Sequence, residues 1–121
     1  MLKTMEIGID NAVAFCMSGK ITEREMSLVL SDAKKKIEQY GNIVLFERID
    51  SFEGIELSAI VDEFEYIFKV GISNIKKAAV ITDKKWIEMI VNIEGRIFKN
   101  IEMKCFSTEE QDSAIEFLKN A

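Results

Sequence analysis

The side chains best suited to chemistry gather in one stretch of the sequence, RIDSFEGIELS, which runs from Arg48 to Ser58. Its carboxylates Asp50, Glu53 and Glu56 stand close enough in sequence for two of them to exchange protons with a substrate as general acid and base. Ser51 adds a hydroxyl group that a kinase can phosphorylate. The stretch therefore has three interpretations, which are an active site, a phosphate-operated switch, and a turn that joins a strand to a helix.

Catalysis finds little support in the rest of the sequence. The chain contains no histidine, which excludes histidine triads, histidine metal ligands and imidazole acid–base chemistry. It also lacks a G-x-S-x-G nucleophile motif and a glycine-rich loop that would cradle phosphates. Carboxylates at the start of a helix have a structural role, because they interact favourably with the helix dipole. We therefore expect no enzyme activity, no metal site and no cofactor.

The composition fits one globular domain, residues 1–121. A chain of this length is typical of a single domain, and 48% hydrophobic with 31% charged residues excludes a disordered chain. The net charge of −5 argues against nucleic acid as a partner. No apolar run is long enough to span a bilayer, and the first residues lack the apolar core of a signal peptide. We expect a cytoplasmic protein.

The two cysteines, Cys16 and Cys105, each lie inside an apolar run. Such residues are usually buried thiols in a reducing compartment, and a disulfide between them is the alternative. Two separated cysteines cannot form a structural zinc site without further ligands.

The elements before Arg48–Ser58 begin with a β-hairpin, because residues 3–9 and 12–17 alternate or run apolar. Thr22 and Glu25 then have the spacing of a capping box, in which each side chain accepts from the other residue's backbone N–H. The helix that they start is predicted to end at Gly41.

Strands and helices alternate through the remaining sequence. Residues 42–49, NIVLFERI, form an apolar run typical of a strand buried on both faces. Asp83 is placed to cap one later helix, and Ser107 with Glu110 repeats the capping box before another. The predicted elements after the chemical stretch are a helix over 55–70, a strand over 76–82, a helix over 84–94, a strand over 101–106 and a final helix.

The resulting order is ββαβαβαβα. Strands that alternate with helices indicate an α/β fold with helical crossovers between parallel strands. We predict a β/α sandwich whose mixed, mainly parallel sheet has about five strands and about four helices. The first strand is predicted to be an antiparallel edge strand.

This order and three short strings resemble the SpoIIAA-like family of the STAS (anti-sigma-factor antagonist) superfamily. The strings are GKIT at 19–22, FEG at 52–54 and TDKKW at 82–86, so the resemblance extends over nearly the whole chain. It implies a small SpoIIAA-like sandwich with a regulatory role. It also implies that the loop after a central strand is the functional end of the molecule.

The phosphoswitch members of that superfamily carry Asp-Ser-Ser-Gly in this loop, and the serine next to the glycine takes the phosphate. Aligning Gly54 with that glycine puts Glu53 at the phosphoserine position and Ser51 at the aspartate position. Glu53 has a negative charge that cannot be switched. Ser51 remains an alternative phosphorylation site, or its hydroxyl, like the Asp50 carboxylate, accepts from unpaired helix amides.

The two helices between the later strands have different apolar surfaces. In the helix after FEG the apolar side chains cover an arc of about 120°, whereas those after TDKK cover about 200°. Trp86, Ile87, Val91 and Phe98, which we call the Trp86 ridge, therefore exceed what one sheet can cover. Either a neighbouring helix or residues 71–75 cover the excess, or the ridge is an exposed binding surface.

Two functions follow from these patterns. The first is a non-enzymatic domain that binds an apolar or lipid-like molecule or a peripheral membrane surface, since a tryptophan beside lysines suits the headgroup region. The second is a protein-interaction module, either a homodimer or an anti-sigma-type partner-switching protein, because tryptophan often anchors interfaces. SpoIIAA-like domains resemble lipid-carrying α/β domains, which favours the first. The candidate surface comprises Ser51, Phe52, Glu53 and Gly54 in the loop and Lys84, Lys85, Trp86, Val91 and Phe98 on the helix.

Overall fold

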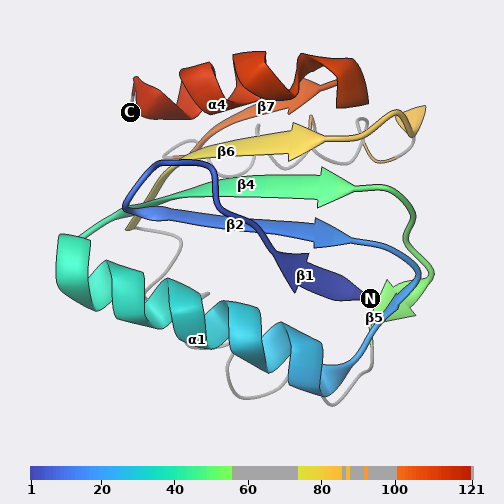
Figure 1. The fold of residues 1–121 in the computed structure, drawn as a ribbon, viewed down its shortest axis with the longest axis horizontal. Coiled ribbons are helices and arrows are strands. Elements are labelled where there is room, and N and C mark those ends of the chain that lie inside the picture. Colours follow the sequence, from blue (N-terminus) through green and yellow to red (C-terminus); the bar gives the residue numbers. More distant parts are fainter. Residues whose placement is uncertain (56–73, 86, 88–91, 93–100, 121) are drawn as a thin grey trace.

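The computed structural model describes residues 1–55, 74–85, 87, 92 and 101–120 (Figure 1). Within them, five strands form one sheet in the order β1-β2-β4-β6-β7. β1 is antiparallel to β2, and every other neighbouring pair is parallel. The prediction of a mainly parallel sheet with an antiparallel edge strand is confirmed. The strands are β1 (Leu2–Thr4), β2 (Ala12–Met17), β4 (Ile43–Ile49), β6 (Ile75–Ile81) and β7 (Glu102–Phe106).

Two helices of the described residues cover opposite faces of this sheet. Figure 1 shows α1 (Glu23–Tyr40) on one side and α4 (Gln111–Lys119) on the other. A short 3-10 turn, Thr108–Glu110, leads into α4. Most of the helices predicted over 55–70 and 84–94 lie outside the described residues, although Lys85, Ile87 and Asn92 are helical.

A second, two-stranded sheet was not predicted. β3 (Lys20–Ile21) pairs in parallel with β5 (Gly54–Ile55), with Lys20 opposite Gly54 and Ile21 opposite Ile55. Ile55, which we predicted to be the first residue of a helix, is therefore in a strand. Two-residue strands are too short to give an alternating pattern, so the sequence carried no signal for this pairing.

Alternation along the strands builds two cores. On one face, Val13, Phe15 and Met17 of β2 pack with Val29 and Ala33 of α1. On the other face, alanines and larger residues of the central strands pack under α4, and this cluster contains Ala12, Ala14, Val44, Phe46, Ala79, Ile81, Phe106, Ala114 and Leu118. Burial on both faces agrees with the apolar runs of the parallel strands.

The two cysteines are free thiols. Cys16 follows Ala12 and Ala14 on the α4 face of β2, whereas Cys105 packs with Ile87 on the other face of β7. β4 and β6 lie between the two strands, which places them roughly 14 Å apart at about 4.8 Å per strand. A disulfide needs Cα atoms within about 7 Å, so the alternative of an intramolecular disulfide is excluded.

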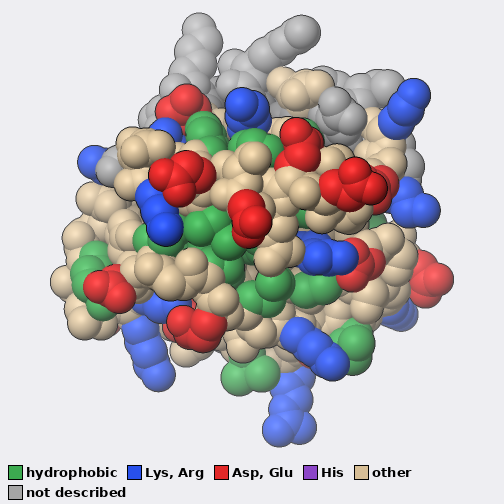
Figure 2. All heavy atoms as spheres, turned by 45° about the horizontal axis from the view of Figure 1, so that its top comes forward, with side chains coloured by type: hydrophobic (Ala, Val, Ile, Leu, Met, Phe, Trp, Pro, Cys, Tyr) green, Lys and Arg blue, Asp and Glu red, His purple; other side chains and the backbone are tan. Residues whose placement is uncertain are grey.

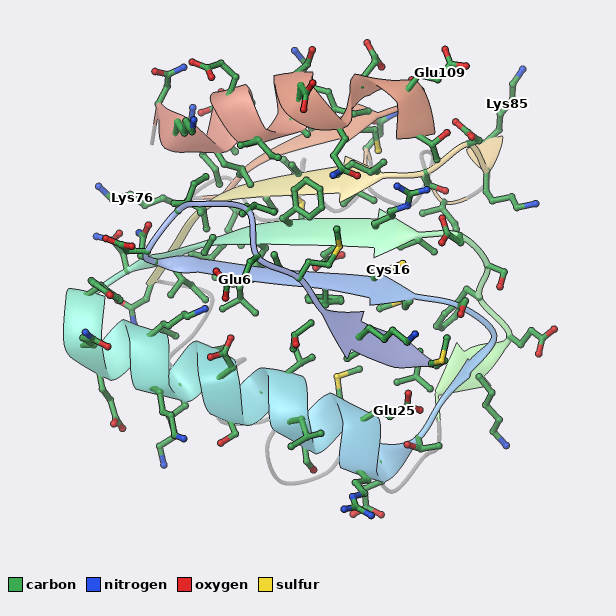
Figure 3. All side chains as sticks on the ribbon, viewed as in Figure 1. Glu6, Cys16, Glu25, Lys76, Lys85 and Glu109 are labelled. Carbon is green, nitrogen blue, oxygen red and sulfur yellow. The ribbon has the colours of Figure 1, made fainter. Side chains whose placement is uncertain are left out.

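The ends of α1 confirm their predicted signals. Thr22 Oγ1 accepts from Glu25 N at 3.2 Å, and Glu25 Oε1 accepts from Thr22 N at 3.1 Å. Glu25 Oε2 also accepts from the backbone N–H of Leu2, which ties the helix to β1 (Figure 3). At the other end Gly41, with φ of 84°, donates its N–H to Ile37 O at 2.8 Å. Because glycine has no Cβ, it adopts this left-handed conformation without strain.

These hydrogen bonds hold the pKa of Glu25 below its ordinary value of 4.5, with the bond from Leu2 N as the largest cause. A carboxyl group with a lowered folded-state pKa stabilises the fold above about pH 4.5, and this contribution is lost as pH falls through the lowered pKa. We expect Glu25→Gln to lower the urea midpoint of unfolding at pH 7, and the difference from wild type to shrink toward about pH 3. Circular dichroism during urea titration at both pH values measures this.

Glu38→Gln is the matched control, since Glu38 is an exposed glutamate on the same helix. If Glu25→Gln lowered the urea midpoint by the same amount at both pH values, the stabilisation could not come from the ionised Glu25 carboxylate.

Candidate functional site

The turns after the four parallel strands lie together at the end of the sheet where these strands finish, which we call the carboxyl edge. The arrowheads of β2, β4 and β6 point to this edge in Figure 1, and the register places Met17 beside Ile49 and Ile81 beside Phe106. Ligands in α/β proteins usually bind at the carboxyl ends of parallel strands. All the candidate residues that the structure describes lie here, in the turns Asp50–Gly54 and Thr82–Lys85.

The Ser51 hydroxyl is part of the loop's own structure. Ser51 Oγ accepts from Gly19 N at 2.9 Å, and Glu53 N donates to Gly19 O, also at 2.9 Å. We expected Ser51 to accept from an unpaired amide of the helix that follows the loop, whereas its partner is the amide of Gly19, in the turn after β2. Gly19 has φ of 66°, a conformation that favours glycine. Asp50 N donates to Met17 O at 3.0 Å, which adds a further hydrogen bond between this loop and the end of β2.

Phe52 and Glu53 point to different surroundings. Phe52 packs against the apolar cluster on the α1 face, whereas Glu53 is exposed. Gly54 continues into β5, where it pairs with Lys20. The loop therefore exposes a carboxyl side chain to solvent and packs its partly buried aromatic side chain against the core.

A polar cluster on the α4 side of this edge was not foreseen. Arg48 Nε lies 3.1 Å from Asp50 Oδ1, and Arg48 Nη1 donates to Gln111 Oε1 at 3.1 Å. Cys16 Sγ donates to Asp50 Oδ2 at 3.3 Å (Figure 3). The cluster joins the ends of β2 and β4 to the first turn of α4. The strand register that brings Cys16 beside Arg48 is long-range, so no local motif could have revealed it.

The Cys16 thiol has a raised pKa. Burial is the largest cause, followed by the hydrogen bond to Asp50 and the negative charge of Asp50, while Arg48 and Lys3 act in the opposite direction. A raised pKa leaves little thiolate at neutral pH, so Cys16 is a poor nucleophile.

The turns after β6 and β7 form the rest of the carboxyl edge, beside the turns after β2 and β4. Asp83, which we predicted to cap a helix, uses both carboxylate oxygens to accept from Thr108, from N at 3.1 Å and from Oγ1 at 2.6 Å. These two bonds lower the pKa of Asp83, the side-chain bond more than the backbone bond. Thr82 Oγ1 accepts from Lys84 N at 3.1 Å.

A polar hollow of about 280 Å³ lies between these turns. Lys85 and Glu110 are among its lining residues, and Figure 3 shows Lys85 and Glu109 at this end of the molecule. Glu110 Oε1 accepts from Ser107 N at 2.9 Å, as the predicted capping box requires, and this bond lowers the pKa of Glu110. The carboxylates of Asp83 and Glu110 thus both accept hydrogen bonds from backbone N–H groups of these turns. Within the described residues, no three His, Cys, Asp or Glu side chains are grouped to hold a metal ion.

Trp86, Val91 and Phe98 of the Trp86 ridge lie outside the described residues. The ridge's remaining member, Ile87, is 5% exposed and packs against Val80, with Met103 and Cys105 nearby. Lys84 and Lys85 are both exposed. Part of the wide apolar arc is therefore covered within the monomer.

An apolar cavity of about 200 Å³ lies between α1 and the sheet, and we call it the α1 cavity. Its lining residues are Val13, Phe15 and Met17 of β2, Met26, Val29, Leu30, Ala33 and Ile37 of α1, Ile43, Leu45 and Glu47 of β4, and Ile75 of β6. Sequence reasoning located α1 from the signals at its two ends but missed the cavity. A pattern of apolar residues predicts which faces meet and carries no information on how closely they fit.

α4 and the 3-10 turn before it carry several exposed acidic side chains, which are Glu109, Glu110, Asp112 and Glu116. Figure 2 shows acidic and basic side chains interspersed over the face of the molecule that it presents. No helix among the described residues is both long and apolar enough to cross a bilayer.

Comparison with known proteins agrees with this geometry. A model of the SpoIIAA-like family matches residues 12–119. The crystal structure of an uncharacterised DUF3478-family protein with a SpoIIAA-like fold, from Shewanella loihica PV-4, matches with a TM-score of 0.74. The two chains are 21% identical, and the match covers 98% of this chain and 92% of that protein, which shows a shared fold. A search of curated proteins found no match.

The Cys16–Asp50 contact predicts a change in thiol reactivity. Asp50→Asn removes a negative charge that raises the Cys16 pKa, so the thiolate fraction at pH 7.5 should increase. We expect iodoacetamide to alkylate Cys16 faster in the variant than in wild type, because the thiolate is the reactive form of the cysteine. Peptide mass spectrometry over time measures the rate, and Cys105 in the same molecule is the internal control. An unchanged Cys16 rate would show that burial alone sets its reactivity.

Proposed function

This chain belongs to the SpoIIAA-like family of the STAS superfamily, and on that premise we propose that it is a non-enzymatic domain that binds an apolar or lipid-like ligand. Family membership indicates a regulatory or interaction module. The identity of the ligand class, and the view that residues 1–121 act as one domain, are our proposals. The observation that carries them is the α1 cavity.

The size and lining of the α1 cavity favour a hydrocarbon ligand. Glu47 is the only charged side chain among the described residues that line it. An apolar cavity of about 150 Å³ can remain dry and bind benzene, so about 200 Å³ has room for a slightly larger ring or a short chain segment. Each methylene group moved from water into such a cavity contributes about 0.8 kcal/mol. Binding therefore needs no polar recognition.

The candidate surface at the sheet edge is proposed as the approach to a peripheral membrane. Lys84 and Lys85 are exposed and suit phosphate headgroups, whereas the exposed carboxylates of α4 and the turn before it would be repelled by anionic lipid. This charge difference would orient the domain with the Trp86 helix toward the bilayer. Flotation with anionic vesicles, compared between wild type and Trp86→Ala, tests this version.

The second candidate function is a protein-interaction module. The exposed Glu53 favours it, because a charge at the position of the family's phosphoserine offers a partner a constant contact. The Ser51 hydroxyl is already an acceptor for Gly19 N, which argues against Ser51 as a phosphate-operated switch. Sedimentation at micromolar concentration distinguishes a homodimer from a monomer, and mass spectrometry after kinase treatment detects phosphate on Ser51.

Filling the α1 cavity should abolish binding of a small apolar probe. Ala33 is 2% exposed and lines the cavity, so Ala33→Leu places a larger apolar side chain in the space. We expect butylbenzene to shift the methyl NMR signals of Val29 and Leu30 in wild type, and its affinity to fall at least about tenfold in the variant. Because cavity filling adds contacts, the melting temperature should stay equal or rise.

Ser31→Leu adds a similar side chain at an exposed position of the same helix and serves as the control. Val29→Leu is a milder filling variant for the case in which leucine at position 33 overpacks the core. Absence of any butylbenzene shift in wild type would overturn the proposed ligand class.

A further inference from the structure

At the amino end of α1, one short segment joins the helix to the floor of the α1 cavity. β2 supplies Val13, Phe15 and Met17 to the floor, and α1 forms the cover. Residues 18–22, which we call the hinge segment, connect them. The path of this segment therefore sets where the amino end of α1 lies relative to the sheet.

The loop after β4 fastens the hinge segment at several points. Gly19 donates to Ser51 Oγ and accepts from Glu53 N, with both bonds at 2.9 Å. The β3–β5 pairing then holds Lys20 and Ile21 against Gly54 and Ile55. These contacts are local to the edge of the sheet and involve no residue of α1.

Apolar contacts carry the same connection into the cavity wall. Ile21 is fully buried, and Phe52 packs against the cluster that contains Ile21. Met17 and Val29, which belong to this cluster, also line the cavity. A displacement of the loop would therefore move side chains of the lining.

The two ends of α1 are held differently. Near the carboxyl end, Lys36 Nζ donates to Ala12 O at 2.7 Å and pairs with Asp32 at 3.2 Å. At the amino end, Glu25 accepts from Leu2 N of the edge strand β1. Release of the hinge segment from the loop would leave the amino half of the helix held by its contacts with the edge strand, while Lys36 keeps the other half on the sheet.

We propose that the loop Asp50–Ile55 is a latch that sets how far the amino end of α1 opens from the sheet. A protein bound to the exposed face of this loop, at Glu53, and an apolar molecule in the α1 cavity would then change each other's affinity, because coupling between two sites is reciprocal. The ligand part of this inference rests on the proposed function, whereas the mechanical part concerns the chain alone.

Hydrogen exchange of the full chain tests the latch without any ligand. Ser51→Ala leaves the Gly19 N–H without its acceptor, and loss of one hydrogen bond shifts an opening equilibrium roughly two- to tenfold. We expect amides of residues 19–21 and 26–30 to exchange faster by about that factor, and those of 36–40 to keep the wild-type rate. Ser51→Thr retains the acceptor and should restore the wild-type pattern, and Ser113→Ala, on exposed α4 surface, is the control.

Unchanged exchange at 26–30, or the same increase throughout the chain, would overturn the latch. If Ser51→Ala does not fold, wild-type exchange in low urea provides the second measurement. The Gly19 and Glu53 amides should then open together with residues 26–30 and at lower urea than residues 36–40. Independent opening of these groups would count against the proposal.

The same variant separates the latch from the ligand hypothesis. Butylbenzene should enter the Ser51→Ala cavity roughly two- to tenfold faster than the wild-type cavity, measured by NMR exchange broadening. An unchanged rate of entry would contradict the proposed coupling between the loop and the α1 cavity. If wild type binds no butylbenzene, the proposed function fails, and hydrogen exchange still decides whether the latch exists.

Discussion

The structure depends on the need to cover both faces of a parallel sheet. Strands such as β4 and β6 bury side chains on both sides, so each face requires its own layer. On one face α4 packs over β4 and β6, and Met5, Ile7 and Ile9 pack against the same apolar cluster. On the other face α1 packs against the cluster that contains Val13, Phe15 and Met17.

The apolar cavity lies on the α1 side of the sheet. Valine, phenylalanine and methionine from β2 meet a helix whose facing positions include the small Ala33. Side chains of unequal size leave space unless their shapes are complementary. Retaining such a space forgoes packing contacts. The polar groups at the carboxyl edge, by contrast, bond to one another and hold the turns in place.

The sequence predicted the elements whose signals are local. Thr22, Glu25 and Gly41 marked the ends of α1, and the apolar runs marked β4, β6 and β7, because caps and buried strands leave patterns within a few residues. The β3–β5 pairing, the Arg48–Gln111 contact and the α1 cavity were missed, since each depends on residues far apart in the chain. The Ser51–Gly54 loop was located correctly at the edge of the sheet, but its main internal partner, Gly19, was not foreseen. The Trp86 ridge stays a prediction, because Trp86, Val91 and Phe98 lie outside the described residues.

The strand order of the main sheet has a consequence for synthesis on the ribosome. β2, β4, β6 and β7 lie side by side in the order in which the chain leaves the exit tunnel. Each emerging strand can add to the last open edge without displacing an earlier one, and that edge is a template for unwanted pairing until the next strand arrives. The alanine-lined face waits longest, since α4 is the last described element and contacts both β4 and β6. A chain that still lacks α4 would therefore leave the α4-facing side of β4 and β6 without this cover, and exposed apolar surface of that kind is what chaperones bind.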